Sequence, residues 1–203
     1  QLPVVKKFPQ RGAVADALGR RAVGDLAQKQ RGLSTVENRF ILWIDAVGGF
    51  LVCLGDEIVL GRPAEGAGVD VPILADLSRR HAVIRRDGES YLLEAIHPTK
   101  VDGRAVQGVT SLNDGSVIEL ASNVELRFRR PHPLSGSARL EIISGHKTVP
   151  HLDAILLMAE SCVLGPAWQN HVVCRPWERD VVLFKHQNQL HCRSKVPLTA
   201  AGE

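Results

Sequence analysis

The chain has 203 residues, a formal net charge of +3, and 44% hydrophobic and 23% charged residues. These proportions allow one large domain or two small ones with a buried core, and they exclude a chain that is disordered throughout. No apolar run approaches the roughly 18 residues of a membrane-spanning helix. Four scattered cysteines are too few for a disulfide framework, so the sequence predicts a reducing, cytoplasmic compartment. With 4% aromatic residues and a weak net charge, it disfavours binding to nucleic acid.

The first 39 residues are basic, with eight Lys or Arg and three Asp or Glu. Residues 1–12 show no periodic pattern. From Ala13 to Gln30 the apolar positions have approximately helical spacing, interrupted by Gly19 and Gly24. The sequence therefore predicts a poorly structured basic segment, a linker or a short helix, over residues 1–39. The chain opens with Gln1 rather than Met, as a fragment or a processed product would.

Short strand-like runs follow one another between residues 40 and 130. β-Branched and aromatic residues fill the first run, Phe40–Ile44, and a Gly-Gly turn leads to a second run at residues 50–54. Later runs alternate with Asp-Gly pairs at 87–88, 102–103 and 114–115, which supply the positive φ that tight turns need. Many short strands without a long helical period predict an all-β sandwich over residues 40–130.

A segment rich in proline, serine and glycine, residues 131–138, is typical of a linker. After it, three stretches echo the preceding unit: residues 162–165 resemble 58–61, residues 179–183 resemble 80–84, and residues 190–193 resemble 91–94. The echoes predict that residues 139–203 form a partial second sandwich-like unit, which stops at about the point corresponding to Ala95.

Three motifs of the first unit occur in a distinctive order. Gly61-Arg62 follows a predicted strand, Ser78-Arg79-Arg80-His81 leads into another, and residues 112–118 contain a Leu-x-x-Gly-x-x-Ile pattern. This order and spacing resembles the forkhead-associated (FHA) domain, a β-sandwich that recognises phosphothreonine peptides. The resemblance covers residues 40–130, and it makes residues 139–203 a degenerate, truncated FHA-like unit.

The resemblance implies that Arg62, Ser78, Arg79 and Thr99 form the phosphopeptide-binding site. Arg62 and Ser78 take the phosphate, Arg79 supports the phosphate or the peptide backbone, and His81 braces the binding loops. Phosphothreonine carries a charge of about −1.5 to −2, and arginine offers it a rigid fork of donors. Because loops at one end of a sandwich cluster, Arg62 and Ser78 can meet although they are sixteen positions apart.

Two departures from the family pattern concern binding. Where the family usually has Asn-Gly-Thr, this chain has His97-Pro98-Thr99. The asparagine normally holds the main chain of the ligand, so the change bears on peptide affinity and selectivity more than on phosphate capture. In the second unit, Pro166 stands at the position of Arg62 and Glu178 falls at or near that of Ser78, which predicts no phosphopeptide binding there.

The sequence thus favours a non-enzymatic adaptor that binds a threonine-phosphorylated protein or peptide in Ser/Thr kinase signalling, without metal or cofactor. The alternative is a structural protein–protein interaction module with a vestigial phosphate pocket, in which Arg62 is a solvated loop residue. A hydrolase is disfavoured because the Gly-x-Ser-x-Gly nucleophile turn is missing. Zinc is disfavoured because His171-x-x-Cys174 has no second matching pair.

Overall fold

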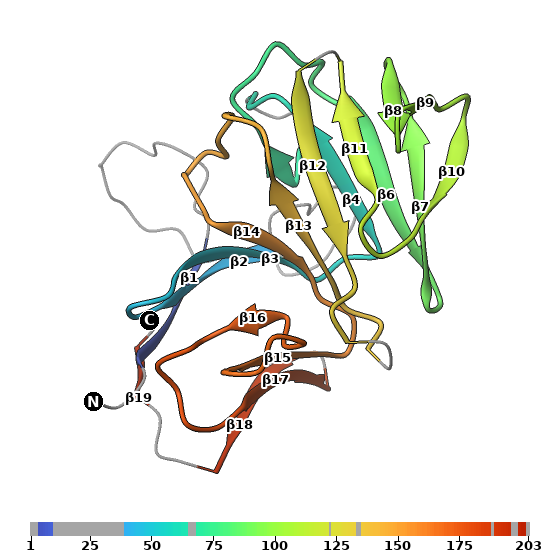
Figure 1. The fold of residues 1–203 in the computed structure, drawn as a ribbon. Coiled ribbons are helices and arrows are strands. Elements are labelled where there is room, and N and C mark those ends of the chain that lie inside the picture. Colours follow the sequence, from blue (N-terminus) through green and yellow to red (C-terminus); the bar gives the residue numbers. More distant parts are fainter. Residues whose placement is uncertain are drawn as a thin grey trace, which may run out of the picture.

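The computed structural model describes residues 4–9, 39–64, 68–121, 123–132, 135–187, 189–195 and 199–201. Every helix or strand assigned within these residues is a β-strand, which confirms the predicted all-β class (Figure 1). The helical turns expected between residues 13 and 30 lie outside the described residues. Residues 4–9 form a strand that the sequence pattern did not indicate. Within the described part of the chain, no helix is long and apolar enough to cross a membrane.

The largest sheet has ten strands and contains both the first and the last strand of the fold. In spatial order they are β19 (Thr199–Ala201), β1 (Val4–Pro9), β2 (Arg39–Ile44), β3 (Gly48–Cys53), β14 (Ala154–Leu157), β13 (Ala138–Ile142), β12 (Val124–Arg129), β11 (Val117–Leu120), β8 (Thr99–Val101) and β9 (Arg104–Ala105).

Two smaller sheets complete the fold. The five-stranded sheet has the order β10 (Val109–Leu112), β7 (Ser90–Ala95), β6 (Ala82–Asp87), β4 (Glu57–Gly61) and β5 (Val71–Pro72). The four-stranded sheet has the order β16 (Val172–Val173), β15 (Ser161–Gly165), β17 (Val181–His186) and β18 (Gln189–Ser194).

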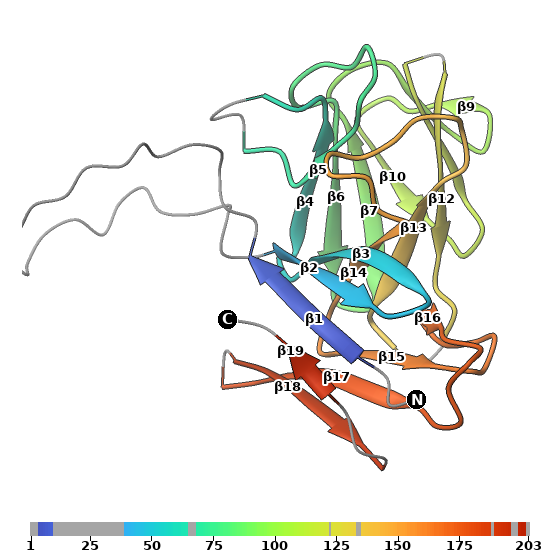
Figure 2. The ribbon, with the colours of Figure 1, turned by 90° about the vertical axis from the view of Figure 1, so that its left-hand side faces the viewer.

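The ten-stranded sheet lies between the two smaller sheets, and each of its faces covers a separate hydrophobic core. Figure 2 shows β2 and β3 with the five-stranded sheet above them and the four-stranded sheet below. Because side chains alternate along a strand, Leu51 and Cys53 of β3 enter the first core, whereas Phe50 and Val52 enter the second. Strands β3 and β14 are thus buried on both faces, which explains why they read as continuous apolar runs.

The hairpin of β13 and β14 closes the first core, although it follows the predicted linker. Strand β13 pairs antiparallel with β12, and β14 pairs parallel with β3. Ala138, Leu140, Ile155 and Leu157 of this hairpin are buried among the side chains of the first core. Residues 131–138, which the sequence marks as a linker, are therefore mainly the connection between two neighbouring strands of one sheet. The predicted domain boundaries stay a prediction.

The four-stranded sheet pairs its strands in the same way as part of the five-stranded sheet. In the five-stranded sheet, Leu60 is paired with Val71 on a parallel strand and with Ala82 on an antiparallel strand. Leu164 has the corresponding partners Val172 and Val181. The hairpin of β6 and β7 and that of β17 and β18 also have the same register, with Ala82 opposite Ala95 and Val181 opposite Ser194. These registers coincide with the three echoes in the sequence.

Candidate functional site

Strand β4 and the loop before β6 meet at Arg62 and Ser78. The backbone N–H of Arg62 donates a hydrogen bond of 3.1 Å to the carbonyl oxygen of Ser78. Further inside β4, the carbonyl oxygen of Leu60 accepts a hydrogen bond of 2.8 Å from the N–H of His81. The loop therefore runs beside the end of β4. Arg62 and Arg79 are exposed there, and Ser78 is half-buried.

Gly61 permits this close approach. A Cβ atom at this position would lie 2.0 Å from the carbonyl oxygen of Arg79 and 2.8 Å from that of Ser78. Both distances are shorter than a carbon–oxygen contact allows, so a residue with a side chain would push the loop away from β4. The Gly-Arg dipeptide thus combines a backbone that admits the loop with a cation next to it.

His81 connects the loop of Ser78 with the turn that precedes β8. Its side chain is buried, and its Nδ1 accepts a hydrogen bond from the N–H of Ser78 at 3.4 Å. Its Nε2 lies 3.0 Å from the carbonyl oxygen of Pro98, to which it donates when it carries the ring proton, and 3.2 Å from the backbone N of Ala121. That oxygen also accepts from the N–H of Ala121 at 3.0 Å. Burial lowers the pKa of His81, which favours the neutral ring that these contacts require.

Thr99 lies in the same region, but its side chain is only 3% exposed. Its hydroxyl donates a hydrogen bond of 2.8 Å to the carbonyl oxygen of His97 and so holds the turn at residues 97–99. The structure therefore brings Arg62, Ser78 and Arg79 together at the surface and places Thr99 beneath it. The predicted contact between Thr99 and a ligand stays a prediction.

The exposed Arg62 and Arg79 differ from Arg80 in their ion pairing. Arg80 forms an ion pair of 3.5 Å with Glu57. Among the residues that the structure describes, no acidic side chain forms an ion pair with Arg62 or Arg79. Two guanidinium groups and a hydroxyl at one end of a sandwich can bind a dianion through charge-assisted hydrogen bonds.

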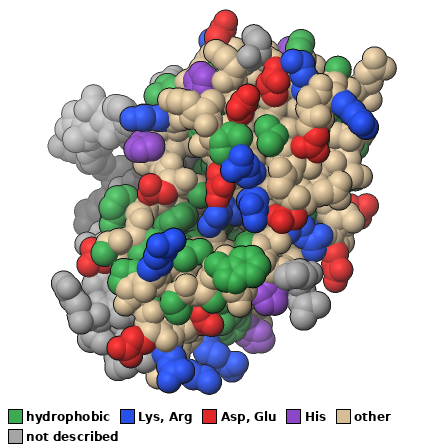
Figure 3. Space-filling model, viewed as in Figure 1, with side chains coloured by type: hydrophobic (Ala, Val, Ile, Leu, Met, Phe, Trp, Pro, Cys, Tyr) green, Lys and Arg blue, Asp and Glu red, His purple; other side chains and the backbone are tan. Residues whose placement is uncertain are grey.

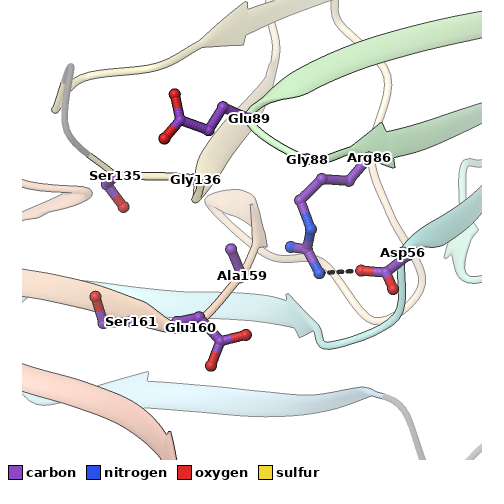
Figure 4. Close-up of a pocket in the computed structure, with 9 residues that line it drawn as sticks. All are labelled: Asp56, Arg86, Gly88, Glu89, Ser135, Gly136, Ala159, Glu160 and Ser161. Carbon is purple, nitrogen blue, oxygen red and sulfur yellow. Dashed lines mark hydrogen bonds and ion pairs between the residues drawn. The ribbon is translucent and has the colours of Figure 1, made fainter.

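A cavity of about 480 Å³ lies at the opposite end of β4, where the turn of β6 and β7 meets the turn of β14 and β15 (Figure 4). Arg86 lines it and forms an ion pair with Asp56. The carboxylates of Glu89 and Glu160 line the same cavity. Three carboxylates around one guanidinium group repel an anion, so this cavity is a poor candidate for a phosphate site.

His171 and Cys174, which have a zinc-like spacing, are both buried, and Cys174 is part of the second hydrophobic core. His171 is fully buried, and its Nδ1 accepts a hydrogen bond of 3.0 Å from the N–H of Val163. Burial, with His132 and Arg139 nearby, lowers the pKa of His171 to about 4. Burial also raises the pKa of the Cys174 thiol to about 12. In the described residues no three His, Cys, Asp or Glu side chains converge as a metal site would require.

Lys147 is a basic residue near the site that the sequence did not point to. It lies in the connection between β13 and β14, and its carbonyl oxygen accepts a hydrogen bond of 2.8 Å from the N–H of Leu74. The sequence placed residue 147 in the second unit, far from Arg62. A strand pattern carries no information on which strand will be its neighbour, so no local signal identified this contact.

Charges of both signs are interspersed over the face of the molecule in Figure 3. Searches of curated proteins and of solved structures gave no match to this chain. The family model described as the FHA domain matches residues 58–121. This segment runs from β4 to the residue after β11 and contains Arg62, Ser78, Arg79, His81 and Thr99. The match supports an FHA domain in the part of the chain that carries the site.

Proposed function

We propose that this protein is a phosphothreonine-peptide-binding module. FHA domains are generally binding modules for phosphothreonine and are typically not enzymes. The observation that carries the proposal is the hydrogen bond from the Arg62 N–H to the Ser78 carbonyl oxygen, which supports it because the two residues that would supply the cation and the hydroxyl are neighbours. Arg62 and Arg79 are exposed and without an ion pair among the described residues, so both can turn toward a phosphate.

We further propose that the module acts as an adaptor which recruits a threonine-phosphorylated protein in Ser/Thr kinase signalling. The support is the generic activity of the family together with the chemistry of the site. A cytoplasmic setting stays a prediction from the cysteine count. The structural alternative, an interaction module with a vestigial pocket, predicts binding of a partner that does not depend on phosphate.

The test is isothermal titration of the full chain with a library of threonine peptides in phosphorylated and unphosphorylated form. We expect heat from the phosphothreonine peptides and none from their unphosphorylated counterparts. Phosphoserine peptides, which lack the methyl group of phosphothreonine, are the matched control for the contribution of that methyl group. Binding that is the same with and without phosphate, or no binding to any member of a diverse library, would contradict the proposal.

We also propose that residues 139–203 contain a degenerate FHA-like unit, because the registers of β15 to β18 match those of β4 to β7. In the matching register, Pro166 is equivalent in position to Arg62, Trp177 to Ser78 and Glu178 to Arg79. Glu178 is therefore one position away from the equivalent of the serine. A proline and a carboxylate in place of two arginines do not favour a phosphate. The titration therefore has an expected stoichiometry of one peptide per chain, and a stoichiometry of two would contradict this assignment.

A further inference from the structure

The four-stranded sheet has one strand fewer than the five-stranded sheet at the edge of β18. In the first unit, β10 pairs antiparallel with β7 along Val109–Leu112. Strand β18 is the equivalent of β7, because each has the same register with the strand before it. The order of the described strands ends at β18, which lies at the lower edge of the molecule in Figure 2. Among the residues that the structure describes, β18 therefore has no equivalent of β10.

The backbone groups of β18 that point to this open edge follow from the strand pairing. The N–H of Lys185 in β17 donates to the carbonyl oxygen of Glu160 at 2.9 Å, so the backbone of Lys185 points toward β15 and away from β18. In an antiparallel pair, such positions alternate with positions that bond the partner strand. Leu190 is opposite Lys185 and Cys192 is opposite Leu183, so the N–H and C=O groups of Leu190 and Cys192 point to the open edge.

The side chains of β18 also leave the second core partly open. In β7, Tyr91 and Leu93 are 1% and 0% exposed, and Leu112 of β10, opposite Tyr91, belongs to the same core. Their equivalents in β18 are Leu190, which is half-buried, and Cys192, which is exposed. A further strand with apolar side chains on this face would cover Leu190 and Cys192 in the way that β10 completes the first core.

The other face of β18 has an exposed arginine and no acidic residue. His191 and Arg193 alternate with Leu190 and Cys192, so their side chains lie on the face away from the second core. Arg193 is exposed and takes part in no ion pair with the described acidic residues. A second copy of β18 would add another arginine to this face, whereas an acidic strand would complement it.

We propose that the open edge of β18 binds an extended segment of a partner protein, which adds to the sheet as an antiparallel strand. The segment alternates apolar residues, which face the second core beside Leu190 and Cys192, with acidic residues on the face of Arg193. This interaction is separate from the phosphopeptide site and does not rest on the proposed function. It gives the second unit a binding role although Pro166 stands at its phosphate position.

The test uses the full chain and a fluorescein-labelled peptide with capped ends, in which Glu and Val alternate over six residues, the length of β18. We expect a saturable increase in fluorescence anisotropy, and a smaller one from the peptide with Lys in place of Glu. The Val residues lie opposite Leu190 and Cys192, so their N–H groups face β18. N-methylation of Val should therefore abolish binding, and N-methylation of Glu should be tolerated.

Variants of the chain locate the peptide. C192P removes an N–H that points to the open edge and is not bonded to β17, so it should abolish binding while urea unfolding stays cooperative. S111P is the matched control, because the N–H of Ser111 points to the open edge of β10. R193E should lower the ratio of Glu-peptide to Lys-peptide affinity at least about two-fold, as loss of an exposed ion pair does. R104E makes the same charge change on β9 and should leave the ratio unchanged.

Each result decides for or against the inference. No anisotropy change, or equal binding of the two N-methylated peptides, would overturn it, and these readouts do not depend on the folding of C192P. If S111P weakens binding as much as C192P does, the peptide pairs with any open edge and the inference fails. It also fails if R104E changes the affinity ratio as much as R193E. If sedimentation without peptide shows a dimer that C192P abolishes, the edge binds a second copy of the chain and the proposed partner is wrong.

Discussion

The Cα of Gly61 lies so close to the carbonyl oxygen of Arg79 that a Cβ on Gly61 would be 2.0 Å from it. This close approach lets the loop of Ser78 lie against β4, where the N–H of Arg62 donates to the carbonyl oxygen of Ser78. G61A is therefore expected to lower the free energy of unfolding by about 1–3 kcal/mol, the usual cost of overpacking, and to weaken phosphothreonine binding by displacing Ser78. Urea unfolding and peptide titration measure the two effects.

Gly145 offers the matched control for this substitution. A Cβ at Gly145 would meet no atom within 4 Å, and its φ is not in the left-handed region. G145A is expected to leave the stability unchanged. If G61A is as stable as the wild type and binds equally well, the loop does not depend on the close approach, and the account of the Gly-Arg dipeptide is wrong.

Arg62 is expected to supply most of the attraction for the phosphate. R62A should lower the affinity for a phosphothreonine peptide about 10- to 100-fold, since hydrogen bonds to charged groups contribute about 1.5–3 kcal/mol. R62K keeps the charge but loses the two-pronged donor geometry, so its affinity should fall between those of R62A and the wild type. R104A, which removes an exposed arginine of β9, should bind like the wild type. An R62A variant with wild-type affinity would exclude Arg62 from the site.

The buried His171 makes the stability of the chain depend on pH. Its folded-state pKa of about 4 lies below the ordinary value of 6.5, so the unfolded chain takes up a proton more readily. Stability is therefore lost as the pH falls from about 6.5 toward 4, by about 3 kcal/mol in total. Urea unfolding at pH 7.5 and pH 4.5 is the measurement.

The variant H171Q isolates this effect from other groups that titrate. Burial also lowers the pKa of His81, so His81 too makes the chain less stable as the pH falls. The H171Q variant therefore retains some pH dependence of its stability. H171Q is expected to lose less stability than the wild type between the two pH values, whatever its stability at pH 7.5. Equal pH dependence in H171Q and the wild type would contradict the prediction.

A fragment of residues 39–135 is expected not to fold, although it contains the whole segment that matches the family. It lacks Leu140, Ile155 and Leu157, which are buried in the first core, and it leaves the edge of β12 without a partner. Each missing large apolar side chain costs about 2–5 kcal/mol, so the three together cost about as much as the whole stability of an ordinary domain, about 5–15 kcal/mol. Denaturant titration should show a cooperative transition for the full chain and none for the fragment. A cooperatively folded fragment that binds phosphothreonine would show that the first unit is autonomous.

The sequence predicted the all-β class and the approximate strands between residues 40 and 130, because alternating apolar residues and Asp-Gly turns are local signals. It also predicted that Arg62 and Ser78 lie at the same end of the sandwich, since loops at one end of a sandwich cluster. The contacts between these residues and a ligand stay predictions. The burial of Thr99 could not be read from the motif, because it depends on the turn that the neighbouring His97 and Pro98 adopt.

The placement of β13 and β14 was beyond the reach of sequence reasoning. The pattern of residues 138–142 and 154–157 predicts strands, but it does not specify that they join β12 and β3 rather than a separate sheet. The composition of residues 131–138 indicates a connection, and the same composition serves a linker between domains and a loop within one. The position of Lys147 beside Leu74 was not predicted for the same reason, since it depends on the pairing of Thr148 with Ile73.

The burial of β3 and β14 on both faces limits how the recognition element can be transplanted. A biosensor that grafts only residues 58–121 onto a carrier protein would leave behind the strands that close the first core. A graft of residues 39–157 would include those strands but expose Phe50, Val52 and Leu156, which pack in the second core against the four-stranded sheet here. If the proposed function is correct, a portable phosphopeptide reader therefore has to include β15 to β18, the sheet for which we propose no phosphate site.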